Sequence, residues 1–192
     1  MKHPPTTEIT VRLPRWVTDV VDFDRVYPDD ESRMRLAIEL ARCNVERETG
    51  GPFGAAVFER LSGRLVSVGT NSVLRSRNSS AHAEMVAFMM AQAAVGCYTL
   101  TGPGMVEHEV FSSCEPCAMC LGGVLWSGVT RLVFAATRED AHRLDFDEGP
   151  VFPESYEYLE DRGISIVRGL LRDEANEVFE IYRERGGLIY NG

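Results

Sequence analysis

The sequence predicts an α/β fold in which helices cover both faces of a central sheet. Segments with apolar residues at three- and four-residue steps alternate with short β-branched runs bounded by glycine and proline. This alternation is typical of a three-layer α/β/α domain. The chain has 192 residues, 44% of them hydrophobic, which is enough for one core without disulfide staples. We expect an N-terminal arm over residues 1–28 and a single domain with a C-terminal helix and tail over residues 29–192.

The first predicted helix begins at Asp29 or Asp30 and runs to about Glu48. Acidic residues at its start suit an N-cap and first helical turn. Its apolar residues recur at helical spacing and define a buried stripe. These residues are Met34, Ala37, Ile38, Ala41 and Val45. Glycines and a proline at 50–52 end the helix. In the arm before it, the alternating pattern at 9–13 predicts a short strand.

The remaining elements follow in alternation. Strands are predicted at 53–58, 65–69, 107–111, 129–135 and 164–167. Helices are predicted at 81–95, 117–126 and 173–185, with a helical turn at 138–142. A polar loop is expected at 75–80 and an acidic loop, rich in glycine and proline, at 145–153.

Charge and cysteine content argue against several classes of protein. The formal net charge is −9, so the chain lacks the general attraction to phosphate on which nucleic-acid binding relies, and nucleic acid is not an expected partner. The cysteines number five, and three lie between residues 114 and 120, which favours a reducing compartment and a metal site. The start of the chain has no apolar signal-peptide core, and the most apolar run, 85–95, is too short to span a bilayer. We therefore expect a cytoplasmic protein that does not enter membranes.

Three residues can supply the ligands of a catalytic zinc ion, namely His82, Cys117 and Cys120. Catalytic zinc sites keep three protein ligands, commonly imidazole and thiolate, and leave one position open. Cys117 and Cys120 are three residues apart and so share one face of a helix. Pro116 suits the start of that helix, where the helix dipole stabilises thiolates. The sequence therefore predicts one zinc ion per chain.

Glu84 follows His82 by two residues and is the candidate proton carrier. Positions i and i+2 do not face each other on a regular helix, so both side chains reach one pocket only if His82 lies at the helix mouth and Glu84 in the opening turn. A helix that begins at 79–81 is compatible with this arrangement. Zinc lowers the pKa of a bound water to about 7, and a nearby carboxylate can then accept the proton of that water.

Cys114 leaves a second interpretation of the metal site open. It precedes Cys117 by three residues and could complete a four-ligand structural site, which would remove the open position that catalysis needs. Its place at the end of a predicted strand, before Glu115 and Pro116, instead suggests that the thiol points elsewhere.

The two short motifs together carry a family resemblance. His82-Ala83-Glu84 followed by Pro116-Cys117-Ala118-Met119-Cys120 is the signature of zinc nucleobase deaminases. From about residue 30 to 150 the chain resembles the cytidine-deaminase-like superfamily, and within it most closely the bacterial guanine deaminases. The segments that carry the closer resemblance are 50–55, Asn71, 81–84, 113–122, Trp126 and the acidic stretch 146–148.

This resemblance implies a five-stranded mixed sheet and the hydrolysis of guanine to xanthine and ammonia. It also implies a homodimer in which the C-terminal segment closes a neighbouring active site. Asn71 is expected to hydrogen-bond the base, Phe53 and Phe146 to sandwich it, and the Ala83 amide to bind an acceptor of the base. Glu148 is expected to contact the leaving amino group.

Several of these roles have plainer alternatives. Asn71 could serve only as a turn former, and Phe146 could belong to the core. Asp145 or Asp147 could replace Glu148, because the whole loop is acidic. Tyr190 could be the aromatic residue that the tail inserts. Trp126 is expected to pack the helix that carries the cysteines.

Position 148 also bears on the substrate, since the familiar relatives have aspartate there and this chain has glutamate. Because this side chain is longer, triazines such as ammeline remain candidate substrates beside guanine. Two further functions remain as alternatives to a guanine deaminase. One is a tRNA adenosine deaminase, which would need a basic surface to bind its substrate. The other is a non-catalytic binding module stabilised by a zinc ion with four ligands including Cys114.

Overall fold

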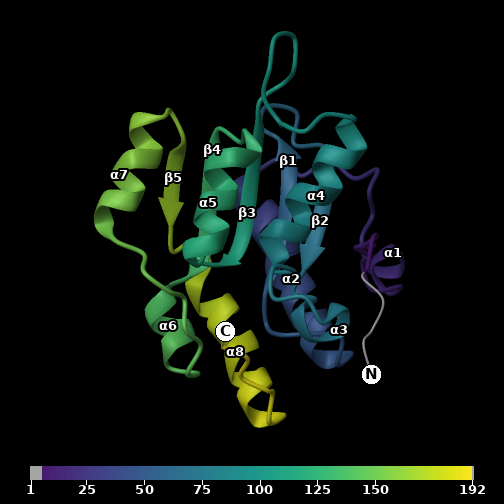
Figure 1. The fold of residues 1–192 in the computed structure, drawn as a ribbon, viewed down its shortest axis with the longest axis vertical. Coiled ribbons are helices and arrows are strands. Elements are labelled where there is room, and N and C mark those ends of the chain that lie inside the picture. Colours follow the sequence, from purple (N-terminus) through teal and green to yellow (C-terminus); the bar gives the residue numbers. More distant parts are fainter. Residues whose placement is uncertain (1–5, 192) are drawn as a thin grey trace.

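The computed structural model describes residues 6–191; residues 1–5 of the expected arm and residue 192 lie outside the described residues. At its centre is a five-stranded sheet in the order β2-β1-β3-β4-β5 (Figure 1). The strands are β1 Gly54–Glu59, β2 Leu65–Thr70, β3 His108–Cys114, β4 Arg131–Ala136 and β5 Ser165–Arg168. β1 is antiparallel to β2 and β3, whereas β3–β4 and β4–β5 are parallel pairs. The predicted α/β fold with a mixed sheet is confirmed.

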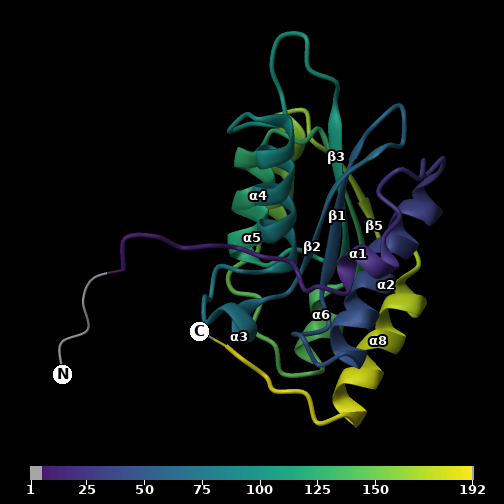
Figure 2. The ribbon, with the colours of Figure 1, turned by 90° about the vertical axis from the view of Figure 1, so that its right-hand side faces the viewer.

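Helices form a layer on each side of this sheet. They are α1 Val17–Val20, α2 Asp30–Glu46, α3 Val73–Ser76, α4 Ala83–Val95, α5 Ala118–Ser127, α6 Arg138–His142, α7 Pro153–Asp161 and α8 Arg172–Glu184. Figure 2 shows α2 and α8 on one face and α4 and α5 on the other. Side chains of β1 alternate between the two layers, as strand geometry requires. Ala55 and Val57 pack toward α4 and α5, and Ala56 and Phe58 toward α2.

Helix α2 does more than cover the sheet, because it also fixes the loops beside the predicted site. The buried Asn44 donates from Nδ2 to the carbonyl oxygens of Gly51 and Asn71, both at 2.9 Å. Gly50 lies so close that a Cβ atom there would be 2.0 Å from the Asn71 carbonyl oxygen. The glycine therefore permits the close approach that aligns the 50–53 turn with the end of β2.

The structure differs from the sequence prediction in three segments. Residues 9–13 of the arm form no strand, because among residues 6–191 no sheet edge pairs with them. Further along, Trp16 is buried and donates from Nε1 to Thr49 Oγ1 at 3.0 Å, so this part of the arm belongs to the domain core. The short helix α3 includes the first two residues of the predicted polar loop, and α7 begins at the last residue of the predicted acidic loop and continues over residues for which no element was predicted. Pro153 begins α7 at a position that suits proline.

Among residues 6–191, no helix combines the length and the apolar character needed to cross a membrane.

Candidate metal centre and active site

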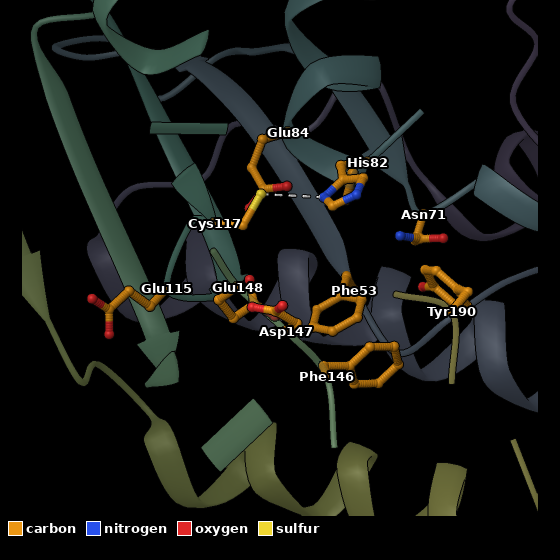
Figure 3. A pocket seen from close by; sticks show the side chains of 11 residues that line it. Phe53, Asn71, His82, Glu84, Glu115, Cys117, Phe146, Asp147, Glu148 and Tyr190 are labelled. Carbon is orange, nitrogen blue, oxygen red and sulfur yellow. Dashed lines mark hydrogen bonds between the residues drawn. The ribbon is translucent and has the colours of Figure 1, made fainter. Parts of the chain in front are cut away.

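The two motifs lie close together because each is at the N-terminus of a helix, and both helices cover the same face of the sheet. His82 is the N-cap of α4 and Cys117 the N-cap of α5, both with extended backbone. The predicted start of α4 at 79–81 is therefore early, and both motif residues stand one position before their helix. His82 Nδ1 lies 3.5 Å from Cys117 Sγ, although the two residues are 35 apart in sequence (Figure 3).

His82, Cys117 and Cys120 form a compact set of possible metal ligands. One ligand atom from each lies within 4.8 Å of the other two. A hydrogen bond from the Cys120 thiol lowers the pKa of Cys117, and a weaker contribution comes from the hydrogen bond with His82. Together they bring this pKa to about 4, which favours a thiolate at Cys117. One imidazole and two cysteine sulfurs converging at the first turns of two helices suit a zinc ion. The residues present therefore fit the metal.

Cys114 does not join this set. Its thiol points to the Thr137 carbonyl oxygen, 3.7 Å away. Complete burial raises the pKa of Cys114 well above its ordinary value, in keeping with a thiol that donates this hydrogen bond. Among the described residues the candidate cluster has three members, and this geometry speaks against the four-ligand interpretation.

Glu84 lies in the first turn of α4 and is almost completely buried beside the cluster. Its Oε1 accepts a hydrogen bond from Ser112 Oγ at 2.9 Å. Burial, and then the negative Cys117, raise the pKa of Glu84. A carboxyl group held in this way can both accept and return a proton. Ser112 was not predicted, since β3 supplies it from a position outside the recognised motifs.

The acidic loop places Glu148 in the same pocket (Figure 3). Burial, and then the neighbouring Cys117 and Glu84, raise the pKa of Glu148 to about 8. The Glu148 carbonyl oxygen accepts from the Ala118 amide at 2.9 Å, which ties the loop to the start of α5. Asp147 also lines the pocket, whereas Asp145 does not.

Asn71 lines the pocket at the end of β2 and is buried. Its Oδ1 accepts from the Val73 amide at 3.3 Å, so the turn-forming use of this residue is present. Its backbone amide donates to the Phe53 carbonyl oxygen at 3.0 Å. Ala83 lines the pocket as the first residue of α4, where a helical amide has no acceptor within its own helix.

Phe53 and Phe146, the two residues expected to sandwich the base, contact each other in this structure. The two rings contact each other edge to face, with centroids 5.1 Å apart and an interplanar angle of 73°. Both rings line the pocket, where the pair forms one apolar wall. Trp126 also departs from its expected packing role, because 79% of it is exposed on α5.

The C-terminal tail closes the pocket of its own chain. Tyr190 lines the pocket, and among the described residues its buried hydroxyl has no hydrogen-bond partner. Asn191 accepts from the Asp147 amide at 2.9 Å and donates to the Asp145 carbonyl oxygen at 2.8 Å. The enclosed space is about 30 Å³, room for a water, while an open hollow of about 360 Å³ adjoins it. The enclosed space is smaller than a purine, and Tyr190 forms part of its wall.

Glu115 is a further pocket residue that the sequence analysis did not assign. Glu115 lies inside the cysteine motif, and this position is the one feature of the sequence that could have indicated a role at the site.

Comparisons with known proteins agree with this geometry. Residues 28–136 match the cytidine and deoxycytidylate deaminase zinc-binding region. The guanine deaminase of Bacillus subtilis is 31% identical over 80% of this chain and 93% of its own. The tRNA-specific adenosine deaminase of Buchnera aphidicola is 28% identical over 78% of this chain and 90% of its own.

Solved structures extend the similarity to the whole fold. The guanine deaminase of Nitrosomonas europaea is 41% identical, covers 95% of this chain and 100% of its own, and superposes with a TM-score of 0.89. A second structure, in complex with 8-azaguanine, is 40% identical over the same shares of both chains, again with a TM-score of 0.89.

Proposed function

This chain belongs to the family of zinc-dependent cytidine and deoxycytidylate deaminases, and within that family we propose that it hydrolyses guanine to xanthine and ammonia. The observation that carries the proposal is a buried Glu84 beside the cluster of His82, Cys117 and Cys120. Similarity to guanine deaminases over most of the chain supports guanine as the substrate.

In the proposed mechanism His82, Cys117 and Cys120 would hold one zinc ion. Zinc in such a site supplies a water whose pKa is near 7. Glu84 accepts a proton from the attacking water and delivers it to the ring nitrogen beside the amino-bearing carbon, to which the oxygen of the water adds. The remaining proton of the added oxygen then passes through Glu84 or Glu148 to the amino group, which leaves as ammonia, and the carbon keeps the oxygen as its carbonyl.

Recognition of the base is assigned to residues on the other side of the pocket. Asn71 hydrogen-bonds the base, the Ala83 amide donates to one of its acceptors, and the pair Phe53 and Phe146 forms an apolar wall. The unpartnered hydroxyl of Tyr190 is available to a polar edge of the substrate once the tail has closed behind it.

Replacing Asn71 by alanine is expected to raise KM for guanine about tenfold to a hundredfold, because a buried polar edge of the base loses its partner. Steady-state xanthine formation measures this. Asn78→Ala is the matched control, since Asn78 caps a nearby turn by accepting from the Ser80 amide at 3.0 Å and does not line the pocket. Unchanged KM in Asn71→Ala would leave Asn71 with only its turn-forming role.

The substrate assignment is tested by ammonia release from zinc-loaded protein given guanine, guanosine, cytosine, adenine, ammeline or tRNA. Guanine is expected to give the highest kcat/KM, with ammeline as the second candidate because of the longer Glu148. The net charge of −9 disfavours tRNA. Turnover of adenosine in tRNA without turnover of guanine would overturn the proposal.

We also propose that the protein acts as a cytoplasmic homodimer in purine catabolism. Large apolar side chains are exposed on α4 and α5, with Met89 and Met119 each 37% and Trp126 79% exposed, and a second copy can cover them. Free cysteines throughout the described chain suit a reducing compartment. Exchange of the C-terminal segment between copies would place Tyr190 of one chain in the pocket of the other.

A further inference from the structure

Glu115 joins the cysteine motif to two elements that flank the acidic loop. Its Oε1 accepts from the Tyr156 hydroxyl at 2.5 Å, and its Oε2 accepts from the Arg138 amide at 3.1 Å. Arg138 begins α6 before the loop, and Tyr156 belongs to α7 after it. Figure 3 shows the Glu115 carboxylate turned away from His82 and Cys117, so it holds the surroundings of the site rather than the substrate.

The loop between these two elements carries Phe146 and Glu148, and it is tied to the same group of residues. The Arg138 side chain donates to the Val151 carbonyl oxygen at the end of the loop. In the middle of the loop, the Glu148 carbonyl oxygen accepts from the Ala118 amide. Only Pro116 separates Glu115 from Cys117, and proline limits the freedom of that turn.

Tyr156 is suited to hold this arrangement rigidly. Its ring is buried, lies 6.3 Å from the Phe134 ring centroid and packs under the Arg168 guanidinium at 4.7 Å. Burial, and then Glu115, raise the pKa of Tyr156, so the hydroxyl keeps its proton and donates. A hydrogen bond from a fixed donor to a carboxylate is among the stronger bonds in proteins.

We propose that Glu115 and Tyr156 are positioning residues for the deaminase reaction, forming a brace that holds the 145–151 loop and thereby sets Glu148 against the metal cluster. The brace rests on the proposed function for its effect on turnover, but its effect on the loop is independent of any substrate. It also gives α7 a role, since this helix supplies the donor.

Tyr156→Phe tests the brace because it removes one hydroxyl and keeps the buried ring. We expect kcat for guanine to fall about tenfold, the loss that corresponds to one such bond. The affinity for 8-azaguanine, measured by calorimetry, is expected to change less, because Asn71 and Ala83 lie outside the loop. Tyr158→Phe is the matched control on the same helix, since Tyr158 is 48% exposed and its hydroxyl accepts from Arg162.

Amide hydrogen exchange of the zinc-loaded protein supplies a readout that needs no activity. In Tyr156→Phe, peptides covering 145–151 are expected to exchange about tenfold faster than in wild type or Tyr158→Phe, with zinc content unchanged. If Tyr156→Phe does not fold, Glu115→Gln carries the same two measurements. Wild-type loop exchange together with wild-type kcat overturns the brace. Faster loop exchange in a protein whose wild type does not turn over guanine overturns the proposed function and leaves the brace standing.

Discussion

Glu84→Gln is expected to reduce kcat for guanine by about 10³-fold or more while the protein keeps one zinc ion per chain. Glutamine retains the size of the side chain and an oxygen that can accept from Ser112 Oγ, which lies 2.9 Å from Oε1. It cannot accept and return a proton, and that is the contribution assigned to Glu84. Xanthine formation and metal analysis on the same preparation measure both quantities.

Glu177→Gln provides the control for this loss of one negative charge. Glu177 is 67% exposed in its ion pair with Arg42 on the outer layer, so its replacement should change neither turnover nor zinc content. Activity of Glu84→Gln near the wild-type level would show that another group carries the proton. Loss of zinc in that variant would instead give Glu84 a part in metal binding.

Cys120→Ser is expected to lose most of its zinc and, with it, turnover. The Cys120 sulfur belongs to the three-residue cluster, and a serine hydroxyl is a poor replacement for thiolate because it stays protonated at neutral pH. Zinc content after dialysis against a weak chelator is the direct measurement. The unfolding midpoint should fall as well, since a metal bound only by the folded state stabilises that state.

Cys114→Ser is the matched comparison, because Cys114 is equally buried in the same motif and bonds to the Thr137 carbonyl oxygen. This variant should keep one zinc ion and its activity. If Cys114→Ser also released the metal, the site would have four protein ligands, and the non-catalytic zinc module would become the better interpretation.

The sequence was informative wherever function depends on residues that are close along the chain. His82 with Glu84, and Cys117 with Cys120, each lie within one helical turn of a helix start, so local rules of capping and periodicity predict their placement. The alternation of strands and helices also predicts the layers, because each element follows from a local pattern of residues. Local patterns predicted the five strands of the sheet, and the family resemblance implied that they form one mixed sheet.

The remaining features depend on contacts between distant segments. Glu115 and Tyr156 are 41 residues apart, and no element is predicted for residues 154–161, which belong to α7. The tail places Tyr190 in the pocket although no periodic pattern covers residues 187–191. The edge-to-face contact of Phe53 with Phe146 depends on side-chain orientation, which the spacing of residues does not specify.

The most direct test of the proposed deamination is the product formed from guanine by zinc-loaded protein in water labelled with heavy oxygen. We expect xanthine and ammonia in equal amounts, with one labelled oxygen in each xanthine molecule, because water supplies the atom that replaces the amino group. Guanine that remains unchanged, while zinc is bound at one ion per chain, would contradict the proposed function.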